Sequence, residues 1–151
     1  MLTTERINCD LCVVGGGLAG LCTAIAAARH GIKVVLMQDR PVLGGNASEE
    51  IRMWVCGAHG KDNRETGIIE ELQLENMHRN PKRNFSLWDA LLYEMVRFEE
   101  NIDLILNCTC CDAKTENGHI ESVKGFQLTT YTWHEVHAKI FVDSSGDSIL
   151  A

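Results

Sequence analysis

The feature that most constrains this chain is a glycine-rich turn, Val13–Gly20, placed between an apolar segment and an alanine-rich one. Gly15, Gly17 and Gly20 give the spacing G-x-G-x-x-G. At this spacing the first glycine permits a tight turn, the second lets a pyrophosphate approach the backbone, and the third lets a helix pack closely on a strand. A helix that begins here offers unpaired N–H groups and a positive dipole end to an anion. The pattern is common by itself, so its meaning depends on the surrounding sequence.

The segments around this turn predict a β-α-β unit. Residues 7–14 become apolar on both faces, which is typical of a central parallel strand. Apolar residues at helical spacing from Leu18 to Ile25 predict a helix that stops near Gly31, and residues 33–37 predict a second buried strand. We expect the connection to be right-handed.

The middle of the chain predicts a long loop and two helices. Residues 39–60 show little periodicity but enough apolar content to be an ordered loop, with a short helix or strand inside. Residues 68–78 have a helical pattern, and Ser86 with Asp89 resembles a capping box for a further helix that ends near Asn101. The expected buried stripe of that helix is Leu87, Leu91, Met95 and Phe98.

The last third of the chain is rich in strand-forming residues. Asn117-Gly118 is a strong signal for a β-hairpin. We expect strands at residues 103–107, 110–115, 119–128, 129–137 and 139–142. The predicted fold class is therefore α/β: a Rossmann-like parallel sheet with a β-α-β start, inserted helices and an antiparallel β-meander.

Composition narrows the possible partners. The 151 residues suffice for one domain, and the formal charge of −7 argues against a general nucleic-acid binder. The chain contains neither an apolar run of spanning length nor a signal-peptide pattern at its start, so we expect no membrane segment and a cytoplasmic protein. Seven cysteines without regular spacing suit a reducing compartment.

The residue that closes the second strand bears on the choice of nucleotide. In dinucleotide-binding folds an Asp or Glu there usually binds the adenosine ribose. Here Gln38 occupies the place, followed by Asp39 and Arg40. Gln38 can still donate and accept hydrogen bonds to a diol, or it is a solvated strand end. Arg40 would alternatively bind a 2′-phosphate, which would indicate NADP.

A second glycine pair, Gly44-Gly45, follows shortly after the second strand. It provides another stretch of approachable backbone amides, which a ligand stretching across the sheet edge can use in addition to the first turn. An ordinary flexible turn is the alternative.

With these segments together, the chain resembles the N-terminal part of an FAD-dependent oxidoreductase with the glutathione-reductase type of two-dinucleotide-binding fold. Within that family it is most similar to a bacterial group that carries, after the second strand, the sequence found here at residues 38–48. The other segments that carry the resemblance are residues 10–20, 50–52 and 142–147.

The resemblance implies FAD as cofactor and a role for each matching segment. Gly15, Gly17 and Gly20 would face the pyrophosphate, and Gln38 would hold the adenosine ribose with Arg40 beside it. The backbone of Cys110 would meet the adenine edge, and the turn at residues 145–147 would close on the cofactor. The full expected cofactor set is Gly15, Gly17, Leu18, Ala19, Gly20, Gln38, Asp39, Arg40, Gly44, Gly45, Asn46, Ala47, Cys110, Ser145, Gly146 and Asp147.

The resemblance also implies a longer protein, in which a substrate domain and a later flavin-binding segment complete the enzyme. Residues 1–151 would be the FAD-binding domain of such a protein, an N-terminal fragment and inactive alone. The complete protein would transfer a hydride or electrons through the flavin between a small-molecule substrate and an acceptor. Arg52 and His59 are weak catalytic candidates; a structural or surface His59 and a merely buried Cys56 are the simpler interpretations.

Two other functions stay open at this point. An NAD(P)-binding module, or a nucleotide-binding remnant without catalysis, finds its best support in Arg40. A structural protein based on thiols or a metal would depend on the cysteines, but Cys9 and Cys12 would point to opposite faces of one strand. Asp143 and Asp147 suit hydrogen bonding to backbone or ribose better than acid–base work.

Overall fold

The centre of the molecule is a four-stranded parallel sheet. The computed structural model describes residues 2–58 and 60–150. The sheet has the order β4-β3-β2-β8, formed by Ile102–Ile105, Val34–Met37, Leu11–Val14 and Ile140–Asp143. Every residue of β2 and β3 is buried, as expected for strands covered on both faces.

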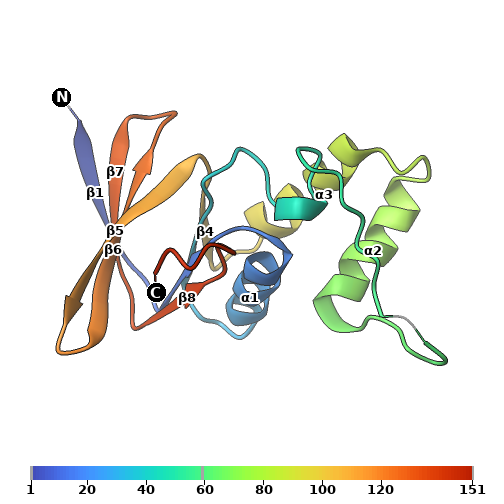
Figure 1. Ribbon diagram of the computed structural model, residues 1–151, viewed down its shortest axis with the longest axis horizontal. Helices are drawn as coiled ribbons and strands as arrows, with labels where there is room; N and C mark the ends of the chain where they lie inside the picture. The colour runs from blue at the N-terminus through green and yellow to red at the C-terminus, as the bar shows by residue number, and fades with distance from the viewer. Residues whose placement is uncertain (1, 59, 151) are drawn as a thin grey trace.

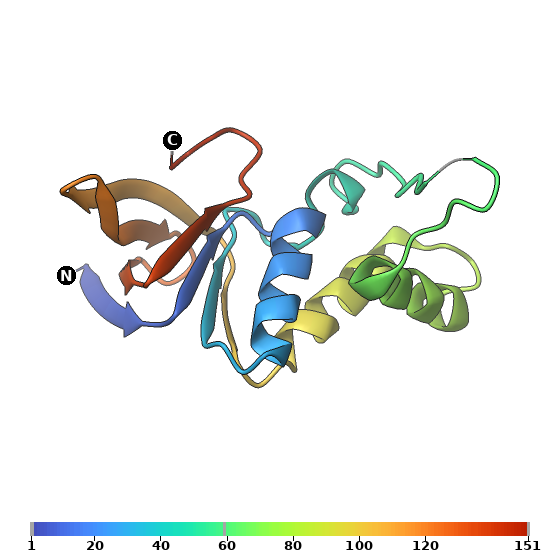
Figure 2. The same ribbon diagram turned by 90° about the horizontal axis from the view of Figure 1, so that it is seen from below.

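The alternation of side chains along these strands separates two cores. Leu11 and Val13 point to one face of the sheet, where α1 (Leu18–Arg29) and α3 (Phe85–Arg97) pack on them. Cys12 and Val14 point to the opposite face, which is covered by a second sheet. Figures 1 and 2 show the resulting order of layers, with the second sheet at one end of the molecule and α2 (Gly67–Arg79) at the other.

The second sheet has the order β1-β7-β6-β5. β5 (Cys108–Glu116), β6 (His119–Gln127) and β7 (Thr132–His137) form the expected antiparallel meander, and β1 (Thr3–Asn8) adds to it in parallel with β7. The hairpin prediction at Asn117-Gly118 is confirmed, because both residues have positive φ (51° and 79°), as a type I′ turn requires.

The prediction of one strand over residues 7–14 is wrong. The chain bends at Cys9 and Asp10, so that β1 belongs to the meander and β2 to the parallel sheet. Asp10 fixes the bend: its carboxylate accepts a hydrogen bond from Lys33 N, and its carbonyl accepts from Lys139 N and Ile140 N. The pairing of β1 with β7 joins residues far apart in the sequence, which periodicity does not report.

The start of α3 also differs from its prediction. Asn84, not Ser86, caps the helix, with its side chain accepting hydrogen bonds from Ser86 N and Leu87 N. The buried face of the helix also differs from the expected stripe, since Leu87 and Phe98 are exposed. Its buried apolar residues are Trp88, Leu91, Leu92 and Val96.

The other elements lie where the sequence predicts them, with shifted ends: β7 begins at Thr132 instead of residue 129, and α3 ends at Arg97 instead of near Asn101. α1 ends one residue before His30, and Gly31 follows with a φ of 79°. The long loop after β3 contains a short 3-10 helix, η1, over Gly45–Ala47. Within the described ranges, no helix is long and apolar enough to cross a membrane. The carboxyl ends of all four parallel strands meet at one edge of the sheet, where α/β proteins bind their ligands.

Candidate functional site

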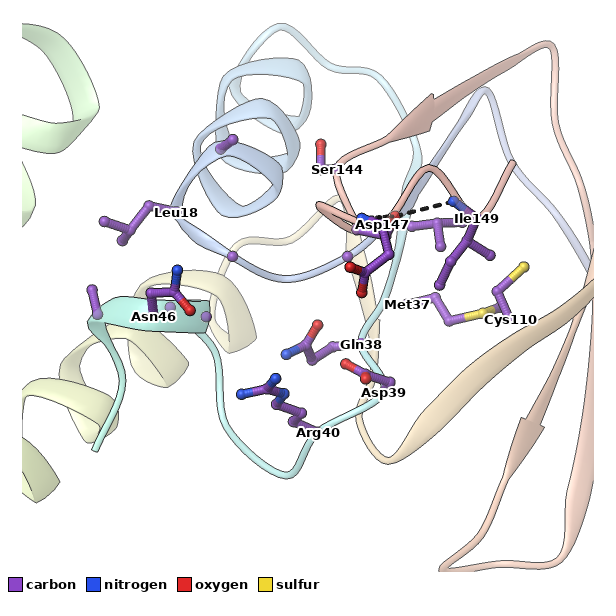
Figure 3. Close-up of a pocket in the computed structure, with 18 of the residues that line it drawn as sticks. Leu18, Met37, Gln38, Asp39, Arg40, Asn46, Cys110, Ser144, Asp147 and Ile149 are labelled. Carbon is purple, nitrogen blue, oxygen red and sulfur yellow. Dashed lines mark hydrogen bonds between the residues drawn. The ribbon is translucent and has the colours of Figure 1, made fainter. Parts of the chain in front are cut away.

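A cavity of about 510 Å³ lies at this edge of the parallel sheet. Figure 3 shows its walls, which come from segments distant in sequence. They are the turn after β2, the residues after β3, the η1 segment, part of β5, and the turn after β8. The structure therefore brings together the glycine turn and the later segments that the sequence singled out.

The three glycines of the first turn have three different environments. Gly15 has a φ of 102°, and a Cβ there would lie 2.5 Å from the Ser144 carbonyl group. A Cβ on Gly20 would lie 1.9 Å from the Gly15 carbonyl oxygen, so the helix packs on the turn without room for a methyl group. A Cβ on Gly17 would meet no atom within 4 Å. The space beside Gly17 is open cavity.

The amino-terminal end of α1 faces this open space. Gly17 is the N-cap residue, no side chain caps the helix, and its first turn contains no acidic residue. The free N–H groups and the positive end of the helix dipole are therefore available to an anion. Leu18 and Ala19, the first two residues of the helix, line the cavity.

The second glycine pair lies directly against the first turn. Gly44 N donates to Gly16 O at 2.8 Å, and Gly17 and Gly44 form an isolated parallel bridge. A Cβ on Gly45 would stand only 3.2 Å from Gly17 Cα. Two backbone segments without side chains thus form a continuous floor, continued by Asn46 and Ala47.

Gln38 holds these two segments in place. It is 4% exposed; its Oε1 accepts a hydrogen bond from Gly16 N at 2.7 Å, and its Nε2 donates to Val42 O at 3.1 Å. A carboxylate here could accept the first bond but could not donate the second. The geometry therefore explains why an amide serves at a position where dinucleotide folds usually carry an acid. The predicted contact of Gln38 with a ribose stays a prediction.

Two acidic side chains and one basic side chain border the cavity beside Gln38. Figure 3 shows Asp39, Arg40 and Asp147 around the same space. Asp39 and Asp147 are exposed, and neither carboxylate bonds to another described residue. Arg40 Nη1 lies 3.3 Å from Glu50 Oε2, so its charge is already compensated.

The turn after β8 is built on Asp143. Its Oδ1 accepts hydrogen bonds from Ser145 N and Ser145 Oγ, and its Oδ2 accepts from Leu150 N. The bond from the Ser145 hydroxyl is the main reason that the pKa of Asp143 lies below its usual range. Asp143 thus bonds to the backbone, as expected, and keeps Ser145 and Asp147 at the cavity wall.

Cys110 lies on the cavity wall contributed by β5. The predicted contact of its backbone with the adenine edge stays a prediction. Its thiol is buried, and burial raises its pKa. All cysteines are free, and among the described residues no group of three or more His, Cys, Asp or Glu side chains is arranged to hold a metal.

The catalytic candidates do not gather at the cavity. Arg52 does not line this cavity; its guanidinium donates to the carbonyl and the carboxylate of Glu49. The interpretation of Cys56 as buried is wrong, because the residue is exposed and its thiol donates to Trp54 O. His59 lies outside the described residues.

Sequence reasoning missed part of the cavity wall, namely Met53, Trp54 and Val55. The apolar content of this loop predicts that the loop is ordered, but it does not indicate that these three side chains face a cavity. Trp54 packs on Phe85 at 4.4 Å between ring centroids, which keeps this part of the loop against α3. The loop is held further by Trp88, whose Nε1 donates to Ala47 O, and by Asp89, whose carboxylate accepts from Glu49 N.

Comparison with known proteins agrees with this geometry. Residues 10–151 match the model of a protein family described as FAD dependent oxidoreductase. A glycerol-3-phosphate dehydrogenase 2 of Mycobacterium bovis is 34% identical over 74 residues, which is 49% of this chain and 12% of that protein. A fumarate reductase (cytochrome) of Shewanella frigidimarina is 53% identical over 38 residues, which is 25% of this chain and 6–7% of that protein.

Solved structures share the fold at low sequence identity. The FrdA chain of E. coli quinol fumarate reductase superposes with a TM-score of 0.68 at 16% identity, over 95% of this chain and 33% of that one. The glycerol-3-phosphate dehydrogenase of Bacillus halodurans, solved with FAD, gives a TM-score of 0.60 at 14% identity, over 91% and 34%. The chain thus spans a minor part of the length of the proteins that it matches.

Proposed function

Because this chain belongs to the FAD dependent oxidoreductase family, we propose that residues 1–151 form an FAD-binding domain whose cavity holds the dinucleotide across the carboxyl edge of the parallel sheet. The single observation that carries the proposal is the contact between Gly17 and Gly44. It leaves a strip of backbone without side chains directly before the uncapped start of α1. Such a strip suits a pyrophosphate, which needs close approach and N–H donors.

The distribution of charge supports one orientation of the cofactor. The start of α1 contains no acid and would take the phosphates, with Leu18 and Ala19 supplying backbone N–H groups. Asp39 and Asp147 would repel phosphates but accept hydrogen bonds from sugar or ribityl hydroxyls. We therefore assign the diol of the adenosine ribose to Asp39 beside Gln38, and hydroxyls nearer the flavin to Asp147 in the turn at 145–147.

The remaining segments complete the proposed site. The backbone of Cys110 would meet the adenine edge, and the strip from Gly44 to Ala47 would lead from the pyrophosphate toward the flavin. Bound flavin supplies hydride or electron transfer, while the protein orients the reactants and excludes water. In the complete protein we propose this chemistry on a small-molecule substrate.

Gly17→Ala tests the proposal without disturbing the fold. Gly17 has a φ of −62°, which alanine adopts freely, and its Cβ would point into the open cavity. We expect the unfolding midpoint to stay within a degree or two of the wild type, while FAD binding, followed by flavin fluorescence, weakens about tenfold or more because the methyl group occupies the phosphate space. Ala26→Ser, on an exposed position of the same helix, is the matched control.

A parallel titration with NADPH separates the alternative nucleotide. Arg40, which would receive a 2′-phosphate, is already paired with Glu50. We expect FAD to bind more tightly than NADPH. Tighter NADPH binding, or wild-type FAD affinity in Gly17→Ala, would contradict the proposal.

A further inference from the structure

A second cavity, of about 630 Å³, lies between the loop at residues 53–55 and the corner formed by α2 and α3. It shares Ala47, Met53, Trp54 and Val55 with the first cavity. One thin stretch of loop therefore separates the two spaces. Neither the sequence nor the comparisons assign a role to this second cavity.

The walls of this cavity are apolar and aromatic, with neutral amides and one positive charge. Apolar and aromatic side chains, including Trp54 and Trp88, form much of the surface, and the polar contributors are amides and one guanidinium. The described lining residues include no Asp or Glu, although the chain as a whole carries a formal charge of −7. A cavity with a cation and no anion favours a negatively charged ligand.

Arg83 supplies the cation, and it is not engaged elsewhere. Every other arginine except Arg97 lies within ion-pair distance of a carboxylate. Among the described residues, Arg83 has no such partner. It also adopts a left-handed backbone conformation with a φ of 53°, which a residue with a side chain adopts at a cost of about 1 kcal/mol or more.

The turn that imposes this conformation is built on a buried asparagine. Asn80 is 2% exposed; its Nδ2 donates to Asn76 Oδ1 and Asn84 O, and its Oδ1 accepts from Asn84 N. Arg83 N donates to Asn80 O at 2.9 Å and closes the turn. The guanidinium is thus attached to a firmly fixed backbone at the cavity wall.

Further donors lie on the α2 wall. The Gln73 side chain makes no hydrogen bond with the described residues, and Asn76 uses only its Oδ1, which leaves its Nδ2 hydrogens available. Trp88 contributes only its ring, because its N–H is bonded to Ala47 O. Unbonded donors beside an apolar surface are typical of a pocket that orients a ligand by a few polar contacts.

We propose that this second cavity binds a small organic carboxylate with a flat apolar body. Its carboxylate would bond to Arg83 and to the amides of Gln73 and Asn76, and its body would lie against Trp54 and Trp88. Binding of the anion does not depend on FAD. The further step, that the anion is the substrate or an effector of the flavin reaction across the loop, rests on the proposed function.

The test uses benzoate, with neutral benzamide of the same shape as its comparison. Each is titrated into the chain without FAD while the three indole N–H signals of Trp54, Trp88 and Trp133 are followed by NMR. We expect saturable shifts from benzoate for Trp54 and Trp88 and none for Trp133, which lies on the meander. Benzamide should bind about tenfold more weakly or worse, since charge-assisted bonds are lost.

Arg83→Met tests the cation, with Arg97→Met as its matched control, because Arg97 also has no ion-pair partner in the part of the chain that the structure describes and does not line the cavity. We expect about tenfold weaker benzoate binding in the first variant and wild-type binding in the second, with both unfolding as the wild type does. Equal affinities for benzoate and benzamide, unchanged binding in Arg83→Met, or the absence of saturable shifts would overturn the proposal. Because FAD is absent from the titration, each of these results leaves the FAD proposal untouched.

Discussion

The side chain of Gln38 and the backbone of Gly16 are joined by a 2.7 Å hydrogen bond that fixes the glycine turn from beneath. The same amide reaches Val42 O, so that one residue ties the turn after β2 to the loop after β3. The floor of the proposed FAD site therefore depends on a side chain that is itself almost completely buried.

Gln38→Glu should destabilise the protein at neutral pH. The new carboxylate would face the Val42 carbonyl oxygen instead of donating to it, and we expect a loss of about 1–3 kcal/mol in the free energy of unfolding. Part of the loss should disappear on acidification, because a protonated carboxyl can donate again. Urea unfolding at pH 7 and pH 5 measures both effects. Gln73→Glu, on α2, is the control and should change the free energy of unfolding little.

Gly20→Ala should damage the fold in a way that Gly17→Ala does not. The added Cβ would overlap the Gly15 carbonyl oxygen, 1.9 Å away, and helix and turn would have to separate. We expect a loss of about 3 kcal/mol, at the upper end for overpacked sites. Thermal unfolding followed by circular dichroism tests this contrast; similar midpoints for the two variants would show that the helix does not pack on the turn as described.

Trp88→Phe should loosen the loop that bears Ala47. The substitution keeps most of the ring packing but leaves the Ala47 carbonyl without its indole donor, at a cost of about 1–2 kcal/mol. Amide hydrogen exchange should therefore speed up in residues 44–53 more than in β6. Uniform acceleration across the chain would instead indicate a general loss of stability.

Asp89→Asn should become more favourable, relative to the wild type, as the pH rises. Burial raises the pKa of Asp89 above its usual value of 3.8, so its protonated form stabilises the fold below that value. This contribution is lost as the pH rises through the folded-state pKa. Asparagine does not titrate, and the difference in unfolding free energy should shift toward the variant between about pH 3.5 and pH 7.

Asp143→Asn provides a control of opposite sign. The Ser145 hydroxyl and backbone N–H groups lower the pKa of Asp143, so its stabilising contribution exists above pH 3.8 and is lost as the pH falls. The relative stability of this variant should therefore decline as the pH rises. Curves that run parallel to the wild type for both variants would refute the two assignments.

Local signals in the sequence predicted much of the fold. Gly15, the helix stop at Gly31 and the Asn117-Gly118 hairpin depend on backbone conformations that few residues allow, and these turns are confirmed. Gly20 is required for a different reason, because a Cβ there would overlap the Gly15 carbonyl oxygen. The pairing of β1 with β7 and the capping of α3 by Asn84 were not predicted. The strand pairing is a long-range contact, which local patterns do not report. For the helix cap, Asn84 and Ser86 are both suitable residues, and the sequence alone does not distinguish them.

The segments that form the first cavity could be predicted from the sequence, but the contacts within it could not. Segments carrying glycine or acidic residues were found and do line one cavity. The hydrogen bonds of Gln38 were not foreseen, since they depend on where Gly16 and Val42 stand in the folded chain. The second cavity could not be predicted from the sequence for a similar reason, because its walls form only when α2 and α3 meet at Asn80.

The position of β8 beside β2 governs when the cavity can form. β2 lies near the start of the described residues and β8 near their end, yet they are neighbours in the sheet through pairs such as Leu11 with Ile140. Such distant pairing slows folding, because a long stretch of chain must be ordered before the contact is made. The cavity wall that carries Asp147 follows β8 in the chain, so during synthesis the cavity stays open on that side until β8 has paired with β2.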